Sequence, residues 1–266
     1  MYDRFKRNIN YLRISVTDRC NLRCRYCMPA EGIKLLSHKD ILRFDEITDF
    51  VKIAVDMGVD KVRLTGGEPL VRKDLPVLVG MLAGIRGIKD FSMTSNGTLL
   101  KELARPLAEA GMHRVNVSLD TMDPLKFSWI TRGGKLEDTI NGIHAAIKAG
   151  LIPLKLNCVV KESKEEPDAR MVASFALENS LEIRYIRQMD LERGEFGVVE
   201  GGDGGNCINC NRLRLTANGK VKPCLFSDIE YDVRELGARQ AISLAVENKP
   251  ACGTVNHDSQ FYNIGG

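Results

Sequence analysis

Two separated groups of cysteines place the strongest constraint on what this chain can fold into. Each group holds three thiols within a short stretch, and the members are Cys20, Cys24 and Cys27 in the first group and Cys207, Cys210 and Cys224 in the second. Thiols in a reducing cytoplasm are not there to make structural disulfides, so closely spaced cysteines indicate metal binding. The sequence therefore predicts two metal centres that are far apart along the chain.

The composition limits which cellular compartment and which classes of partner can be expected. The N-terminal stretch has scattered charges and lacks the apolar core of a signal peptide, and no apolar run reaches the length of a membrane span. The 38 Lys and Arg residues barely exceed the 35 Asp and Glu residues. Proteins that bind nucleic acid through its phosphates carry a larger, clustered excess of positive charge. We expect a soluble cytoplasmic protein with no nucleic-acid or membrane partner, for which a small anionic ligand remains compatible.

Short β-rich runs alternate with amphipathic helical patterns over most of the chain. The expected strands are 11–16, 61–65, 91–94, 114–120, 154–160 and 182–189, and the expected helices are 44–58, 74–87, 99–111, 135–150 and about 166–179. Asp74 is a candidate N-cap, and Pro106 is expected to bend its helix or to mark a late start. Six strands, most of them followed by a helix, predict an α/β fold with a parallel sheet, open or curled into a partial barrel.

The alternation stops after residue 189. We predict an α/β domain at 1–190, a glycine-rich linker at 191–206, and a small C-terminal domain at 207–266. The last of these carries the second cysteine group, one helix near 232–247, and a tail that ends in Gly265-Gly266.

The first cysteine group has the spacing C-x3-C-x2-C. Three thiolates on one loop can bind three irons of a cubane cluster and leave the fourth iron open to a small molecule. A zinc site is the first alternative, but zinc usually takes four ligands, and no His or fourth Cys lies close by in the sequence. A loop of unrelated buried cysteines is the second alternative. The spacing favours an iron–sulfur cluster.

The residues around this group resemble the signature of the radical S-adenosylmethionine (SAM) superfamily. Tyr26 precedes the third cysteine, and the following strand ends in Gly66-Gly67-Glu68-Pro69, which is similar to the GGEP motif beside the SAM amino group in that family. The resemblance implies SAM on the open iron, release of a 5′-deoxyadenosyl radical, and a partial (β/α)6 TIM-like barrel.

The second group has the spacing C-x2-C-x13-C, which taken alone favours zinc. However, CNRLRLTANGKVKPCLF (210–226), the opening RISVTDRCNLRCRYCMP (13–29) and the terminal Gly-Gly resemble the GTP 3′,8-cyclases of molybdenum cofactor biosynthesis. The resemblance implies two [4Fe-4S] clusters, the second in a small auxiliary cluster domain and approached by guanine. It also implies conversion of GTP to (8S)-3′,8-cyclo-7,8-dihydroguanosine 5′-triphosphate, a lyase reaction.

The same resemblance assigns site residues. The implied SAM contacts are Tyr26, Gly67, Ser118 and Met189, and the implied GTP contacts are Arg13, Arg63, Thr94, Lys155, Arg212 and Arg214. A triphosphate requires several converging Arg or Lys donors, so this set is chemically reasonable. Gly265 and Gly266 are implied to reach the active site and to act in catalysis. An electron donor such as flavodoxin or ferredoxin is implied as well, and a homodimeric state stays open.

One departure from the resembling family concerns the short segment 190–206, which is several dozen residues longer in that family. The alternative function is therefore a radical SAM enzyme with an auxiliary cluster that acts on a peptide or another metabolite. A third, non-catalytic alternative is a metal-binding module or electron carrier. Cys158 is expected to be a buried core thiol. Cys252 has no assigned role, because the resemblance argues against a fourth ligand to the second cluster.

Overall fold

A single sheet of nine strands organises the computed structural model, which describes residues 1–257 and 261–264. The strands have the spatial order β6-β5-β4-β3-β2-β1-β7-β8-β9. Their bounds are β1 (Tyr11–Ser15), β2 (Lys61–Thr65), β3 (Asp90–Ser95), β4 (Arg114–Ser118), β5 (Lys155–Val160), β6 (Glu182–Arg187), β7 (Arg212–Leu215), β8 (Lys220–Lys222) and β9 (Tyr231–Asp232). The predicted catalytic residues Gly265 and Gly266 lie outside the described residues.

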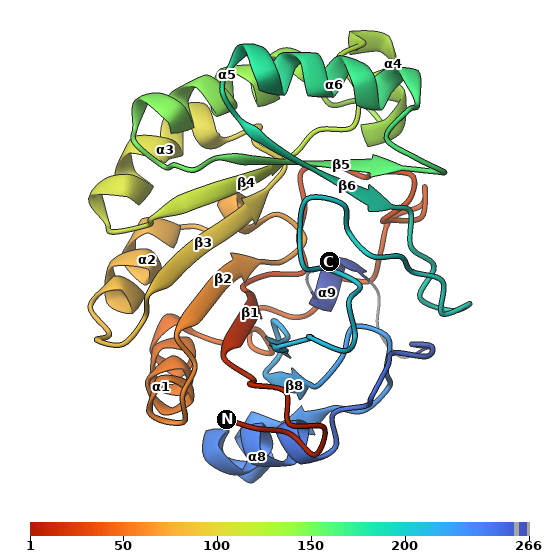
Figure 1. The fold of residues 1–266 in the computed structure, drawn as a ribbon. Coiled ribbons are helices and arrows are strands. Elements are labelled where there is room, and N and C mark those ends of the chain that lie inside the picture. Colours follow the sequence, from red (N-terminus) through yellow and green to blue (C-terminus); the bar gives the residue numbers. More distant parts are fainter. Residues whose placement is uncertain (258–260, 265–266) are drawn as a thin grey trace.

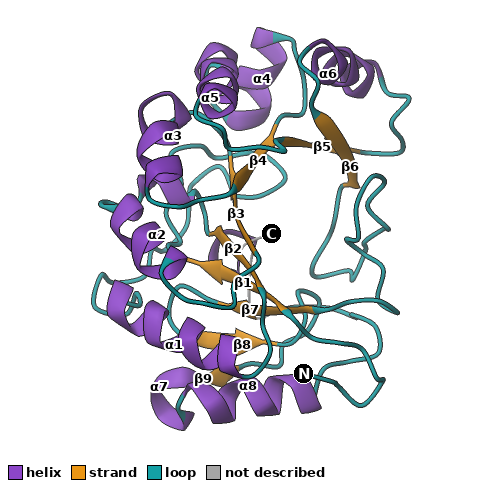
Figure 2. Ribbon diagram, turned by 60° about the vertical axis from the view of Figure 1, so that its left-hand side comes forward, coloured by secondary structure: helices purple, strands orange, loops and turns teal. Residues whose placement is uncertain are grey.

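Most of the helices cover the outer face of this curved sheet (Figures 1 and 2). Their bounds are α1 (Phe44–Asp56), the short 3-10 helix η1 (Pro69–Val71), α2 (Leu75–Ala83), α3 (Leu100–Glu109), α4 (Pro124–Thr131), α5 (Leu136–Lys148), α6 (Pro167–Glu178), α7 (Val233–Leu236), α8 (Ala238–Glu247) and α9 (Phe261–Ile264). Within residues 1–257 and 261–264, no helix has the length and apolar character needed to span a membrane.

The first six strands are mutually parallel and confirm the predicted α/β class. Each pairs with the next in sequence, and helices connect most of them, as expected for right-handed crossovers. Alternation along β1 directs Leu12 and Ile14 into the apolar core, where Phe50 of α1 and Leu78 of α2 also lie almost fully buried. The opposite face carries the polar side chains, and the sheet curves around it.

The C-terminal region continues the same sheet. Strand β7 pairs in parallel with β1, with Arg212 opposite Tyr11, and β8 and β9 follow in antiparallel order. Through this pairing, the second cysteine group is attached to β1, the strand that leads into the first cysteine group. The predicted domain boundaries stay predictions.

The structure differs from the helix predictions in four places. Helix α4 was missed, although Asp123 caps it by accepting hydrogen bonds from two backbone N–H groups, and Pro124 occupies its first turn. The helix predicted near 232–247 is divided into α7 and α8 at Gly237, whose positive φ of 76° interrupts the helix. Asp74 precedes α2, but its carboxylate makes no capping hydrogen bond. Pro106 lies inside α3, which starts at Leu100, so the late start is excluded.

A close contact between α5 and the loop after β3 gives a test of this packing. An ideal Cβ at Gly142 would lie 2.0 Å from the carbonyl oxygen of Gly97, so Gly142→Ala must displace backbone. We expect the free energy of unfolding to fall by about 1–3 kcal/mol in urea titrations. Gly80 of α2 has no atom within 4 Å of its ideal Cβ. Gly80→Ala is the matched control and should raise stability by about 0.5–1 kcal/mol. An equally stable Gly142→Ala protein would contradict the contact.

Candidate active site

The first cysteine group lines a cavity of about 200 Å³ inside the curved sheet. Cys20, Cys24 and Cys27 lie on the loop that follows β1, and most of the other walls come from residues in or just after β2, β3, β4, β5 and β6. The carboxyl ends of parallel strands meet at one edge, which is where α/β barrels place their reactive groups. All four predicted SAM contacts line this cavity: Tyr26, Gly67, Ser118 and Met189.

The Gly66-Gly67 pair allows the end of β2 to lie directly against the cysteine loop. An ideal Cβ would lie 2.5 Å from the Thr17 oxygen at Gly66 and 2.4 Å from the Arg19 oxygen at Gly67. In the space that the missing side chains leave, the backbone N–H of Gly67 donates to Thr17 at 2.8 Å, and that of Glu68 donates to Arg19 at 2.8 Å. The two glycines therefore fix the cavity wall to the loop that carries the thiols.

Glu68 is an acid held almost fully out of water at this wall. Its carboxylate accepts hydrogen bonds from the backbone N–H of Leu70 at 3.1 Å, the backbone N–H of Asn96 at 2.7 Å and the hydroxyl of Ser95 at 2.8 Å. Burial raises the pKa of Glu68 to about 7, although these hydrogen bonds oppose the shift. A cationic amino group placed here would favour the ionised carboxylate.

Tyr26 is fixed by a second buried acid. Its hydroxyl donates to Asp120 at 2.7 Å, and the other oxygen of Asp120 accepts from the backbone N–H of Val159 at 2.8 Å. Desolvation raises the pKa of Asp120 and also that of Tyr26, for which the charge of Asp120 is the next cause. The sequence did not mark Asp120 as a site residue, although it ends the predicted strand 114–120.

The three thiols fit a group that brings positive charge. Burial raises the pKa of Cys20 to about 11 and that of Cys27 to about 12, and it also raises the pKa of Cys24. Such thiols bind iron as thiolates, so the cations of a cluster would supply the missing counter-charge. Thr94 adds a buried hydroxyl with no hydrogen-bond partner among the described residues. These residues fit a three-cysteine cluster with room for a ligand beside it.

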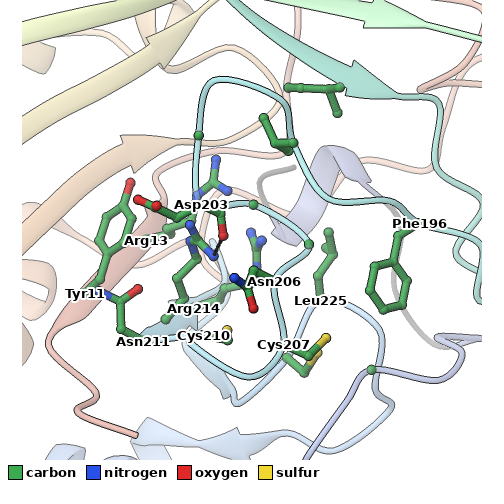
Figure 3. A pocket seen from close by; sticks show the side chains of 18 of the residues that line it. Tyr11, Arg13, Phe196, Asp203, Asn206, Cys207, Cys210, Asn211, Arg214 and Leu225 are labelled. Atoms are coloured by element: carbon green, nitrogen blue, oxygen red, sulfur yellow. Dashed lines mark hydrogen bonds between the residues drawn. The ribbon is translucent and has the colours of Figure 1, made fainter. Parts of the chain in front are cut away.

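The second cysteine group lines a neighbouring cavity of about 250 Å³ (Figure 3). Cys207 and Cys210 precede β7, and Cys224 follows β8. Asn157, Ile186 and Met189 line both cavities, which therefore meet at these side chains. A molecule that fills the second cavity can reach the wall of the first.

Arginines from neighbouring strands form one row across the floor of the second cavity. The register pairs Arg214 with Arg13, and Arg13 with Arg63. The row continues through Ser92 to Arg114. Because these strands are parallel and in register, their side chains at one level emerge on the same face. The guanidinium groups of Arg63 and Arg212 lie over the ring of Tyr11, at 5.5 and 5.7 Å from its centroid.

Desolvation and mutual repulsion act together on this row. Loss of water, followed by repulsion from neighbouring arginines, lowers the pKa of Arg214 to about 10 and that of Arg13 well below its usual range. Asp90 accepts from Arg114 at 2.6 and 3.0 Å, which offsets part of the charge. The cavity is thus strongly cationic and suits a polyanionic ligand.

Four of the six predicted GTP contacts lie together here, namely Arg13, Arg63, Arg212 and Arg214. Thr94 lines the first cavity instead. Lys155 lines neither cavity, and its ammonium group pairs with Glu182 on the adjacent strand.

Sequence reasoning missed several cationic residues of the second cavity. Arg114 and Arg184 line it, and both lie next to apolar residues on the predicted strands 114–120 and 182–189, so strand periodicity could have marked them as candidates for the inner face. Lys249 is also part of the wall and is almost fully buried, where its ammonium group donates to the carbonyls of Arg212 at 2.8 Å and Pro223 at 2.5 Å.

Positive charge distinguishes the second cysteine group from the first. Burial alone would raise the pKa of Cys210, but Lys249, a backbone hydrogen bond and Arg212 make the net shift downward. Within the part of the chain that the structure describes, no three or more His, Cys, Asp or Glu side chains surround a position for a single metal ion. A cubane cluster has a different requirement, because each iron takes one thiolate. Cationic neighbours favour thiolates and thus fit such a cluster.

The predicted linker forms a wall of the second cavity. It has no helix or strand, only isolated bridges such as that between Tyr185 and Glu200. Its Gly202–Asn206 stretch lines the cavity, and the Asp203 carbonyl accepts from Arg212 at 3.1 Å. Phe196 stacks on Phe226 with ring centroids 4.5 Å apart. The short segment therefore closes the site as well as connecting its parts.

Helix α9 brings the described part of the tail into the same interior (Figure 1). Phe261 lines the first cavity, and Ile264 is buried in a small apolar cluster with Leu191, Leu225 and Phe226. The tail is thus anchored up to the residue that precedes the two terminal glycines.

Comparison with known proteins identifies the class that this fold and site define. A family model described as the Radical SAM superfamily matches residues 14–175, so the chain belongs to that superfamily of enzymes. The solved structure of Streptococcus suis SuiB bound to S-adenosylmethionine superposes with a TM-score of 0.66 at 15% identity, covering 91% of this chain and 64% of that one. At this identity, the likeness supports the partial-barrel fold alone.

The particular family follows from closer relatives. The chain is 42% identical to the GTP 3′,8-cyclase of Thermodesulfovibrio yellowstonii, covering 89% of this chain and 88% of the relative. It is 41% identical to the GTP 3′,8-cyclase of Moorella thermoacetica, covering 88% and 86%. A model described as Molybdenum Cofactor Synthesis C matches residues 163–251. The chain belongs to the GTP 3′,8-cyclase family. Its alignment with the first relative extends over 282 positions, more than the 266 residues present here, so it is a shortened member.

The buried acid Glu68 predicts a specific pH dependence of stability. Its pKa rises from 4.5 to about 7 on folding, so ionisation destabilises the folded protein as the pH rises through 7. Relative to the Glu68→Gln protein, the free energy of unfolding of the wild-type protein should fall by up to roughly 3 kcal/mol between pH 4.5 and pH 8. Urea unfolding of both proteins without SAM measures this difference, in which the other carboxylates cancel. A difference that does not change with pH would contradict the burial of an ionisable Glu68.

Proposed function

We propose that this chain converts GTP to (8S)-3′,8-cyclo-7,8-dihydroguanosine 5′-triphosphate, the first step of molybdenum cofactor biosynthesis. The observation that carries the proposal is the contact between two cavities of different chemistry. One combines three thiols with Gly67 and Glu68, and the other combines three thiols with a row of arginines. The name of the close relatives, GTP 3′,8-cyclase, supports GTP as the substrate.

The first cavity would hold a [4Fe-4S] cluster on Cys20, Cys24 and Cys27, with SAM beside it. Bound there and reduced by a donor of the flavodoxin or ferredoxin class, this pair supplies the radical that abstracts hydrogen from the substrate. Glu68 would accept hydrogen bonds from the SAM amino group, and Tyr26 would be held in place by Asp120. Met189 would lie between SAM and the substrate, since it lines both cavities.

The second cavity would hold the guanine and the triphosphate at different ends. Cys207, Cys210 and Cys224 would bind a second [4Fe-4S] cluster, whose open iron the base approaches. The arginine row would bind the phosphates, because planar guanidinium groups form paired hydrogen bonds with phosphate oxygens. Arg184 and Arg114 also line this cavity and would add positive charge beyond the predicted contacts. Gly265 and Gly266 would act next to the substrate, which is supported by the position of α9.

Iron content tests the two-cluster arrangement. Anaerobic reconstitution should load roughly eight irons per chain, and replacing Cys207, Cys210 and Cys224 with Ala should leave roughly four. Replacing the first group should abolish SAM cleavage and leave the second cluster in place. Cys158→Ala is the matched control, because that thiol is fully buried on β5 and should not change the iron content. Stoichiometric zinc without iron would contradict the proposal.

Nucleotide binding tests the role of the arginine row. GTP should bind more tightly than guanosine, and its affinity should fall as salt is added, because phosphate contacts are screened. Arg212→Ala should weaken GTP binding by about 1–3 kcal/mol in calorimetry and leave guanosine binding nearly unchanged. Arg86→Ala removes an exposed arginine outside the cavity and should change neither. Equal affinities for GTP and guanosine would favour a peptide or another metabolite as the substrate, and the product from GTP, SAM and reductant would decide.

A further inference from the structure

A fourth thiol lies beside the second cysteine group, although it is distant from that group in sequence. The sulfur of Cys252 is 3.1 Å from the sulfur of Cys207. Both are free cysteines. A disulfide requires about 2.05 Å between sulfurs, so closure of this pair needs a movement of only about 1 Å. No other pair of cysteines among residues 1–257 is in hydrogen-bond contact through its sulfurs.

Hydrogen bonds from one buried arginine hold the two cysteine segments together. Arg7 is buried and paired with Asp3 at 2.6 Å. One terminal nitrogen of its guanidinium donates to the carbonyl of Cys207 at 2.8 Å and to that of Ala251 at 3.0 Å, and the other donates to Pro250 at 2.6 Å. A single side chain thus ties the backbone of Cys207 to the residue before Cys252.

The position of Cys252 relative to the cavity decides between two roles. Cys207, Cys210 and Cys224 line the second cavity, and Cys252 does not. Its side chain is exposed, so a small solute can reach it. A fourth ligand to an iron that faces the substrate would have to lie inside the cavity. Cys252 instead lies on the outer side of Cys207, where a thiol can react with Cys207 only when that sulfur is not bound to iron.

We propose that Cys207 and Cys252 form a disulfide in the cluster-free protein and that this bond withholds one ligand from the second cluster. A low-molecular-weight disulfide is the oxidant. The Cys252 thiolate attacks it, its S–S bond breaks, and one small thiol leaves. The sulfur of Cys207 then displaces the second small thiol from the mixed disulfide. Two electrons pass to the oxidant, and the two thiol protons end on the two small thiols.

The consequence of the bond rests on the proposed function, in which Cys207 is a cluster ligand. The Cys207–Cys252 disulfide would then form only where the second cluster site is empty, since iron at Cys207 protects its sulfur from thiol–disulfide exchange. Reduction by a dithiol reopens the site for assembly. Cluster insertion and disulfide formation therefore compete for the same sulfur.

The test uses the full chain, freed of iron by a chelator under anaerobic conditions and then exposed to one equivalent of glutathione disulfide. After alkylation of the remaining thiols, mass spectrometry should find a peptide that joins Cys207 to Cys252 in most molecules. The reconstituted protein should show less than a tenth of this product, and dithiothreitol should remove it. Cys252→Ser should lack the product, and Cys158→Ser, which alters a buried thiol, should form it at the wild-type level.

Two further comparisons make the outcome decisive. Arg7→Gln should slow the linkage several-fold, and Arg4→Gln, at an exposed neighbouring position, should not. Linked protein should take up about half the iron of reduced protein in a brief reconstitution without added thiol. Linkage of Cys207 to Cys210 in place of Cys252, or no linkage, would overturn the proposal without affecting the proposed function. Linked protein that takes up iron in full would instead overturn the assignment of Cys207 as a cluster ligand.

Discussion

Repulsion among arginines that are held out of water is the constraint on which the candidate site depends. The parallel register places Arg214, Arg13 and Arg63 side by side, and desolvation lowers the pKa of each. Asp90 balances Arg114, but the acids that line the cavity are fewer than the cations. Desolvation and repulsion at these arginines therefore oppose folding, and a polyanion placed in the cavity would offset that cost, which is the usual exchange of stability for function at binding sites.

The two cysteine groups show how one ligand pattern is placed in two electrostatic settings. At the first group, burial raises the pKa of all three thiols, and neighbouring thiols or the acids Glu68 and Asp120 add to the shift. At the second group, Lys249 and Arg212 favour a thiolate at Cys210. Hydrogen bonds and nearby charge tune the properties of iron–sulfur clusters, so identical ligand counts do not imply identical chemistry.

Much of the fold and part of the site could be predicted from the sequence, because the controlling features are local. Strand periodicity located β1 to β6, and spacing located both cysteine groups. The sequence could not show that β7 joins β1, since strand pairing across the chain depends on tertiary packing. For the same reason the sequence could not show that Thr94 lines the first cavity while the arginines line the second. Nor could it show that Lys155 pairs with Glu182. The contact between Cys207 and Cys252 also depends on Arg7, which no motif marks.

The parallel pairing of β1 with β7 also fixes a length. Cys210 lies just before β7, and Cys20 lies just after β1, so the two cysteine groups flank opposite ends of adjacent strands. Strand β1 has five residues, and at about 3.3 Å per residue it spans on the order of 15 Å. The length of one strand thus makes the main contribution to the separation between the two groups of thiols. Under the proposed function, a substrate held by the second group and attacked from the first would have to bridge that interval.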